Sequence, residues 1–298
     1  MKSIYRGRFA PSPTGPLHFG SLIAAVGSFL DARSAGGVWL VRIEDLDPPR
    51  EIPGSADDIL RTLERLGMHW DETVLYQSQN HSAYQEALEK LSAKNCIYPC
   101  SCSRRDIREA TGQTAIYPGT CRNGMVEGQT ARSIRMRVDN SLIDYQDRLA
   151  GRLQENLATE TGDFIIKRAD GLFAYQLAVT VDDAAQNITD IVRGHDLFDN
   201  TARQIHLQQQ LGLTTPRYLH LPLATWPDGS KYSKQTQAPS IHHENPATLL
   251  IQALRFLKQP VPEMLTNEKL DTIWQWAIKN WDSQNLPLQH TIVTQPLT

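Results

Sequence analysis

The chain has 298 residues, of which 40% are hydrophobic and 21% are charged, and this composition excludes collagen-like, disordered and membrane proteins. Its formal net charge is −3, so the molecule as a whole is not a general polyanion binder and any nucleic acid must meet a local patch. The sequence shows no long apolar run and no signal-peptide pattern after Met1, so we expect a cytoplasmic, monomeric protein that does not contact membranes.

The first part of the chain predicts alternating strands and helices. Residues 3–9 have the pattern of a short strand, and three prolines exclude a helix from the loop at 10–16. Apolar residues at helical spacing between 22 and 30 predict a helix that ends at Gly36-Gly37, and residues 38–43 are typical of a buried parallel strand. This order predicts a parallel sheet whose ligand edge includes the first loop and Glu44.

Later segments continue the alternation of strands and helices, which is interrupted by a polar region at 96–138. Ser55 is predicted to be the N-cap of a helix that ends at Gly67, and a second helix is predicted at 82–94. Residues 96–138 are polar and carry seven arginines against three acidic residues, which favours an inserted subdomain with a phosphate-facing side. The remaining expected elements are a strand at 164–166, an apolar core stretch at 172–181, a strand at 188–192, a helix at 196–211, a loop with some strand at 222–239, and a helical tail from Pro246.

We therefore expect a doubly wound α/β nucleotide-binding domain with an insertion and a helical tail. The expected parts are the first half of the catalytic domain at 1–95, the inserted subdomain at 96–160, the second half at 161–240, and the tail at 241–298.

Two short strings carry the chemistry of phosphate binding. In the first, His18 and Gly20 lie where a proline-rich loop ends and a helix begins. An imidazole and main-chain N–H groups at this helix N-terminus can bind phosphates. In the second, Lys231-Tyr232-Ser233-Lys234 follows Asp228-Gly229, and two lysines on a loop match the charge of a triphosphate. Alone, His18 would be an ordinary surface histidine and the lysines a solvated loop.

The cysteines favour metal binding. Cys100 and Cys102 are separated by one residue and Cys121 follows them, a set that suits tetrahedral zinc with a fourth ligand still to be found. The alternative is a group of buried free thiols. Cys96 matches no ligand position, and we interpret it as a packing residue.

The two strings resemble the HIGH and KMSKS signatures of class I aminoacyl-tRNA synthetases. His18-Phe19-Gly20-Ser21 departs from the first at Ser21, and Lys231-Tyr232-Ser233-Lys234-Gln235 departs from the second at Tyr232. The segment Arg8–Gly15 is similar to the opening of glutamyl-tRNA synthetases, and Asp182-Asp183 and residues 193–197 also resemble that family. The short paralogues of these enzymes, which modify queuosine in tRNA(Asp), are the best match, because few residues follow the second signature.

The resemblance assigns roles to individual residues. It implies ATP bound with Mg²⁺, and His18 and Lys234 as the catalytic pair. The ATP-binding residues would be His18, Gly20, Ser21, Lys231, Ser233 and Lys234. The glutamate-binding residues would be Arg8, Phe9, Ala10, Pro11, Ser12, Glu44, Tyr175 and Arg193. Glu44 is also a suitable partner for the substrate ammonium because it directly follows a buried strand. The zinc ligands would be Cys100, Cys102, Tyr117 and Cys121, with one structural zinc.

The implied activity has two steps: activation of L-glutamate with ATP, without tRNA, and transfer of glutamate to queuosine in the anticodon of tRNA(Asp). One alternative is a truncated glutamyl-tRNA synthetase that charges a tRNA 3′ end. Another is a binding module that holds tRNA through zinc and arginines without chemistry, although such a module has no need of both His18 and Lys234.

Overall fold

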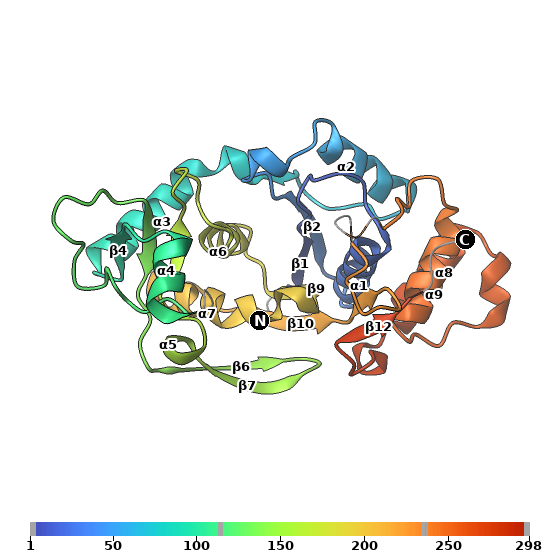
Figure 1. Ribbon diagram of the computed structural model, residues 1–298. Coiled ribbons are helices and arrows are strands. Elements are labelled where there is room, and N and C mark those ends of the chain that lie inside the picture. Colours follow the sequence, from blue (N-terminus) through green and yellow to red (C-terminus); the bar gives the residue numbers. More distant parts are fainter. Residues whose placement is uncertain (1–3, 113–115, 234–235, 237, 295–298) are drawn as a thin grey trace.

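The structure is a computed structural model that describes residues 4–112, 116–233, 236 and 238–294. Figure 1 shows an elongated molecule with helix α4 (Arg104–Thr111) near one end and helices α8 (Pro246–Phe256) and α9 (Leu270–Asn280) near the other. The main parallel strands lie between these ends. Within the described part of the chain, no helix is both long and apolar enough to cross a membrane.

The elements alternate between strand and helix through most of the chain. The strands are β1 (Arg6–Phe9), β2 (Val38–Ile43), β3 (Leu75–Tyr76), β4 (Ile97–Cys100), β5 (Ser133–Met136), β6 (Leu142–Asp147), β7 (Gly151–Asn156), β8 (Phe164–Lys167), β9 (Asp190–Gly194), β10 (Arg217–Leu221), β11 (Leu223–Thr225) and β12 (Thr291–Val293). The remaining α-helices are α1 (Phe19–Ser34), α2 (Ser55–Arg65), α3 (His81–Ala93), α5 (Leu157–Glu160), α6 (Tyr175–Ala185) and α7 (Thr201–Leu211). The 3₁₀ helices are η1 (Pro48–Arg50), η2 (Gln77–Gln79), η3 (His195–Asn200), η5 (Glu263–Asn267) and η6 (Ser283–Asn285).

Strands β3, β2 and β1 form one parallel sheet, and β9 and β10 belong to a neighbouring sheet in which β9 lies beside β1. β1 pairs with β2 and β2 with β3, while β9 pairs with β10 along its whole length. β1 and β9 meet just before β9 begins, where the Thr189 amide donates to the Arg6 carbonyl at 2.9 Å. The chain order reverses between β1 and β9, and the carboxyl ends of strands at such a point form a ligand crevice.

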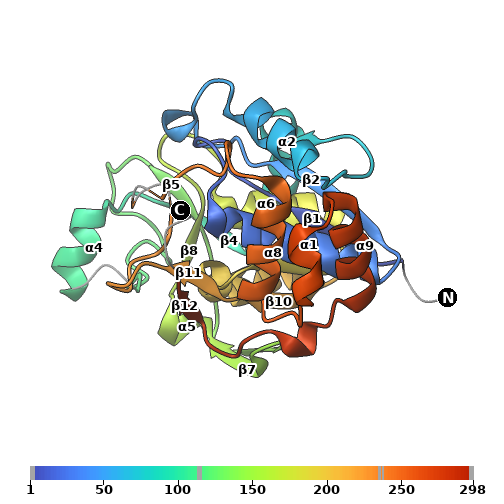
Figure 2. The same ribbon diagram turned by 90° about the vertical axis from the view of Figure 1, so that its right-hand side faces the viewer.

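Two apolar cores cover the two faces of this sheet. In β2, Trp39, Val41 and Ile43 pack into the core that contains α1, α8 and α9, whereas Leu40 packs into the core that contains α3, α6 and α7. Figure 2 shows α1, α8 and α9 on one side of the molecule. Because β2 is buried on both faces, it is apolar at almost every position rather than at alternate ones.

Helix α1 begins and ends where the sequence signals indicate. The His18 side chain accepts from the Ser21 amide and the Ser21 hydroxyl accepts from the His18 amide, which completes a capping box. The helix ends before Gly36, whose φ of 65° is the left-handed conformation that glycine adopts without a steric penalty. A Cβ on Gly27 would lie 2.4 Å from Leu221 Cδ1, so the helix approaches the sheet more closely than a larger residue allows.

The prediction that Ser55 caps α2 is wrong. Gly54, with a φ of 79°, is the N-cap, and Ser55 is the first residue of the helix. The Ser55 hydroxyl instead accepts from the Gly15 amide and donates to the Gly15 carbonyl, both at 2.9 Å. This long-range contact ties α2 to the proline-rich loop, and no local sequence signal contains it.

Other boundaries differ modestly from the sequence predictions. The apolar stretch at 172–181 contains the start of α6, the strand predicted at 188–192 is β9, and the helix predicted at 196–211 divides into η3 and α7. The hairpin of β6 and β7 was not predicted. Its β6 strand alternates exposed and buried residues and pairs in parallel with β10 through Asp147 and Tyr218.

The polar middle region builds a second sheet. Strands β4, β5 and β8 are antiparallel in that order, so the sheet joins segments on both sides of residue 160. At the other end, α8 and α9 pack on α1 through ring contacts between Phe19 and Phe256 and between Phe29 and Trp274. The tail therefore belongs to the core of the catalytic unit rather than extending from it.

Candidate functional site

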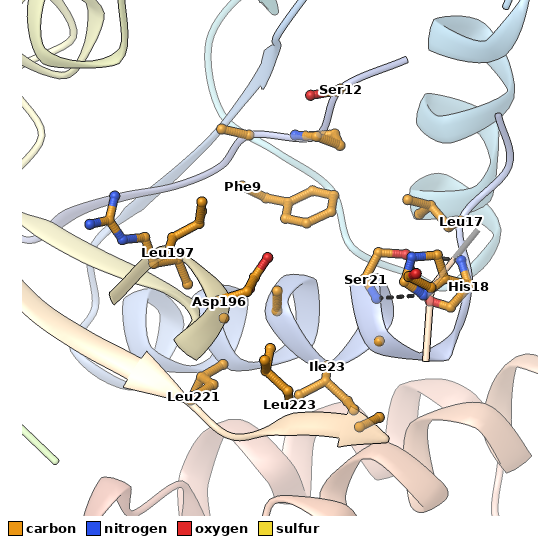
Figure 3. A pocket seen from close by; sticks show the side chains of 18 of the residues that line it. Phe9, Ser12, Leu17, His18, Ser21, Ile23, Asp196, Leu197, Leu221 and Leu223 are labelled. Carbon is orange, nitrogen blue, oxygen red and sulfur yellow. Dashed lines mark hydrogen bonds between the residues drawn. The ribbon is translucent and has the colours of Figure 1, made fainter. Parts of the chain in front are cut away.

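A cavity of about 370 Å³ lies at the carboxyl ends of β1 and β9, beside the N-terminus of α1. Figure 3 shows its walls: Phe9 from β1, Ser12 from the first loop, His18 and Ser21 at the N-terminus of α1, and Asp196 and Leu197 from η3 after β9. Except for Lys234, every residue that the sequence assigns to ATP or glutamate lines this cavity. Lys234 falls outside the described residues.

One end of the cavity has the features of a phosphate site. The Nδ1 atom of His18 accepts from the Ser21 amide at 3.3 Å, which leaves Nε2 as the ring nitrogen that can donate. The Ser21 hydroxyl donates to the His18 carbonyl at 2.8 Å, which commits it to the helix cap. A Cβ on Gly20 would lie 2.8 Å from the Tyr232 carbonyl oxygen, so Gly20 permits the second signature to approach the first.

The second signature is held by contacts on both sides. The Lys231 ammonium pairs with the Asp196 carboxylate, and both residues line the cavity. Tyr232, which replaces the methionine of the signature, is fully buried and its ring lies 4.4 Å from that of Trp226. Trp226 Nε1 also donates to the Thr236 hydroxyl at 3.1 Å. An aromatic residue thus fills the signature position and anchors the loop by packing.

The other end of the cavity gathers charged groups. Arg8 donates to Asp183 at 2.9 Å, and Arg42 contacts the same carboxylate at 2.8 Å and Glu44 at 3.7 Å. Burial alone would raise the pKa of Asp183, but Arg42 and Arg8 hold it below its ordinary value. Burial raises the pKa of Glu44 to about 7, and the two arginines offset only part of that effect. Burial also raises the pKa of Tyr175, to about 12, so its phenol is neutral in this wall.

Arg193 stands apart because its partners are uncharged. Its guanidinium donates to His220 Nε2 at 3.0 Å, to Gln204 at 2.7 Å and to Thr201 at 2.8 Å. Burial lowers the pKa of His220 to about 4, so the ring is neutral, and its Nδ1 contacts Asp147 at 2.7 Å. Among the described residues, no carboxylate oxygen lies within 4.0 Å of the Arg193 nitrogens. Two of the five guanidinium N–H groups stay available for a carboxylate in the cavity.

Sequence reasoning missed the residues that support this wall. Arg42 has a signal, because a charged residue inside an otherwise apolar strand must have a buried partner. His220 and Asp147 have none: the pairing of β9 with β10 sets Arg193 opposite His220, and Asp147 arrives on the unpredicted β6.

A second candidate site is the cysteine cluster in the polar region. The sulfurs of Cys100, Cys102 and Cys121 all lie within 4.8 Å of one another, and the last two are 3.5 Å apart. The Tyr117 hydroxyl lies 3.4 Å from Cys100 Sγ and 3.6 Å from Cys102 Sγ. Four-coordinate zinc with Zn–S bonds of about 2.3 Å requires sulfurs about 3.8 Å apart, so this set fits the ion.

Arg135 determines the electrostatics of the cluster, and the fourth cysteine is not part of it. The Arg135 guanidinium lies 3.7 Å from the Tyr117 ring centroid and donates to Cys100 Sγ at 3.3 Å, which suits an anionic ligand set. Cys96 lies elsewhere, with its sulfur 3.3 Å from Gln210 Oε1.

The arginines of residues 96–138 divide into two groups. Three are structural: Arg122 pairs with Asp163, Arg135 is buried at the cysteine cluster, and Arg137 lies over the Tyr98 ring. These three therefore do not contribute to the predicted phosphate-facing side, because each makes an internal contact. The exposed ones are Arg104, Arg105, Arg108 and Arg132.

Comparisons with known proteins agree with this geometry. A family model described as "tRNA synthetases class I (E and Q), catalytic domain" matches residues 5–256. A protein of Dechloromonas aromatica named glutamyl-Q tRNA(Asp) synthetase is 53% identical and is covered over 98% of this chain and 99% of its own. A protein of the same name from Thiobacillus denitrificans is 53% identical, with 97% of each chain covered.

A solved structure supports the fold. The glutamate tRNA ligase of Elizabethkingia meningosepticum, in complex with its amino acid, has a TM-score of 0.81 at 24% identity, and the match covers 95% of this chain and 66% of that one. At that identity the likeness concerns the fold alone. The family match and the relatives that align over nearly the whole chain show that the chain belongs to the class I glutamyl and glutaminyl tRNA synthetase family and, within it, to the group of glutamyl-Q tRNA(Asp) synthetases.

Proposed function

We propose that this chain activates L-glutamate with ATP, without tRNA, and then transfers the glutamyl group to queuosine in the anticodon of tRNA(Asp). One observation carries the proposal: a single cavity joins a wall with two arginines and one carboxylate to a helix N-terminus with a histidine and a lysine. The two relatives that match over nearly their whole length are named glutamyl-Q tRNA(Asp) synthetase, which supports the transfer to queuosine in tRNA(Asp).

The charges of the amino-acid wall match glutamate. Arg8, Arg193 and Glu44 line the cavity, so this wall is complementary to two carboxylates and one ammonium. Arg8 is already paired with Asp183, whereas Arg193 has only neutral partners. We therefore assign the side-chain carboxylate of glutamate to Arg193, where it would supply a missing counter-ion, and the ammonium to Glu44. The rest of the glutamate pocket is Arg8, Phe9, Ala10, Pro11, Ser12 and Tyr175.

The first step forms the mixed anhydride. An oxygen of the α-carboxylate attacks the α-phosphorus of ATP, the bond to the bridging oxygen breaks, and pyrophosphate leaves with that electron pair. Magnesium that accompanies ATP neutralises part of the phosphate charge. His18 Nε2–H and the α1 N-terminus donate to phosphate oxygens, Lys231 and Lys234 balance the charge on the leaving group, and the Ser233 hydroxyl donates a hydrogen bond to it. Ser21 contributes through its main chain and the helix cap.

The second step needs no nucleophilic side chain. A hydroxyl of the queuosine ring attacks the glutamyl carbonyl, AMP leaves, and the hydroxyl proton passes to the departing phosphate or to water. Catalysis in both steps is therefore positioning together with electrostatic stabilisation.

Two features of the polar region complete the proposal. Cys100, Cys102, Tyr117 and Cys121 hold one structural zinc, which fixes the ends of β4 and the start of α4 against each other. The exposed Arg104, Arg105, Arg108 and Arg132 contact the RNA backbone near the anticodon loop.

Labelling of two tRNA forms tests the proposal. The protein is incubated with labelled glutamate, ATP, and tRNA(Asp) that either lacks its 3′ CCA end or is intact but lacks queuosine. We expect label on the first and none on the second. The reverse pattern would identify a synthetase that charges the 3′ end, and no label with either form, together with no glutamate-dependent ATP–pyrophosphate exchange, would leave a binding module.

A further inference from the structure

The C-terminal strand β12 lies beside the strand that leads into the second signature. β12 pairs in parallel with β11, from Leu223 opposite Thr291 to Thr225 opposite Val293. Main-chain hydrogen bonds extend this pairing at both ends: the Leu223 amide donates to the His290 carbonyl at 2.9 Å, and the Thr294 amide donates to the Thr225 carbonyl at 2.8 Å. β12 therefore fixes the direction in which the chain leaves β11.

The opposite edge of β11 carries the signature itself. The Tyr232 amide donates to the Ala224 carbonyl at 2.8 Å, and Thr225 and Lys231 form an antiparallel bridge. β11 is thus a middle strand between the signature and the C-terminal strand, and its Leu223 and Ala224 line the cavity. A shift of β11 would carry Lys231 with it.

A separate contact joins the same C-terminal segment to the other side of Lys231. The His290 ring stacks on the His195 ring with centroids 3.9 Å apart and planes inclined by 24°. His195 directly precedes Asp196, whose carboxylate pairs with Lys231. Residues 290–293 therefore support both members of this ion pair indirectly. Pairing of β12 with β11 supports Lys231, and stacking of His290 on His195 supports the neighbouring Asp196.

Burial does not account for these contacts. Thr291 and Val293 are exposed, Val293 by 60%, and Ile292 is only half-buried. Little apolar area is removed from water, so the strand contributes little to global stability. The strand instead positions its neighbours, because it sets the register of β11 and the orientation of the His195 ring.

We propose that residues 290–293 are a positioning element that holds Lys231 and Asp196 in place for the ATP phosphates. This inference rests on the proposed function, since the ATP loop acts in adenylate formation. None of these residues touches the reacting atoms; they act through β11 and His195.

Two truncations make a matched test. One chain ends at Gln289 and lacks the element, and the control ends at Thr294 and lacks only residues 295–298. We measure glutamate-dependent ATP–pyrophosphate exchange, the dissociation constants of ATP and glutamate by calorimetry, and the melting temperature. The shorter chain should lose about ten-fold or more in kcat and bind ATP more weakly, because small displacements of catalytic groups are costly. Its glutamate affinity should equal that of the control.

Point variants separate the ring contact from folding. His290→Ala should lower kcat, and His290→Phe should restore it because a phenyl ring can stack on His195. Gln289→Ala, at the exposed neighbouring position, should leave kcat unchanged.

Equal kcat and ATP affinity in the two truncations would overturn the proposal. So would a loss of glutamate binding and melting temperature in proportion to the loss of activity, since that pattern indicates general unfolding. If the full chain shows no exchange, the proposed function fails, and the ATP affinities of the two truncations then decide the positioning role independently.

Discussion

Two buried groups of the cavity wall, Glu44 and His220, change their pKa on folding in opposite directions. Burial raises the pKa of Glu44 from 4.5 to about 7 and lowers that of His220 from 6.5 to about 4. In each case the neutral form is the one that the folded protein favours. Because a displaced pKa is also a stability difference, both groups make the free energy of unfolding depend on pH.

The signs are opposite. The folded pKa of Glu44 lies above its ordinary value, so its contribution is fully present below pH 4.5 and is lost as the pH rises through 7. The folded pKa of His220 lies below its ordinary value, so its contribution is present above pH 6.5 and is lost as the pH falls through 4. Each displacement corresponds to about 3 kcal/mol, so between pH 4.5 and 6.5 the two slopes cancel.

Urea unfolding at a series of pH values across this window measures the effect. Compared with the native profile, the free energy of unfolding of Glu44→Gln should fall by about 1 kcal/mol for each unit of acidification, and that of His220→Phe should rise by about the same amount. The double variant should recover the native slope, and Glu268→Gln, at an exposed position, should keep the native profile. Identical slopes in the native chain and both single variants would refute the reasoning.

Three further predictions concern function and metal. The Michaelis constant for glutamate should rise as the pH falls below 7, by up to about ten-fold per unit, because protonated Glu44 cannot pair with an ammonium; a flat profile in exchange assays would remove Glu44 from that role. Lys234→Ala should lower the exchange kcat by about 10²-fold with little change in glutamate affinity, and unchanged turnover with a higher Michaelis constant for glutamate would contradict this. Metal analysis should find about one zinc per chain, lost in Cys121→Ala and kept in Cys96→Ala; zinc lost from the second variant would make Cys96 a ligand.

The fold was predictable where local signals decide it. The apolar run 38–43 coincides with β2, and the helical spacing that follows Phe19 coincides with α1, because each pattern is set by the burial of that segment itself. Ser55 shows the limit, since its hydroxyl bonds a glycine 40 residues away rather than its own helix. The β6–β7 hairpin escaped prediction because Leu142 is apolar but exposed and Asp147 is charged but buried, so the alternation of apolar and polar residues in β6 is broken at both ends.

The candidate site followed from the sequence only in part. Motifs located the residues that line the cavity, since each string is local and specific. They could not locate Asp147 and His220, which reach Arg193 through the register of three strands from separate parts of the chain. Arg135 was grouped with RNA-facing arginines because a sequence does not show that a guanidinium lies against the Tyr117 ring.

The supporting residues set the charge of the amino-acid wall. Neutral His220 separates Arg193 from the carboxylate of Asp147, so the positive charge of Arg193 is not cancelled inside the protein. Arg42, at 3.7 Å, and Arg8 offset only part of the cost of burying the Glu44 anion. A ligand with a carboxylate for Arg193 and an ammonium for Glu44 relieves both charges at once. With the proposed assignment of the side-chain carboxylate to Arg193, we expect the wall to favour glutamate over glutamine, since glutamine brings no anion to Arg193.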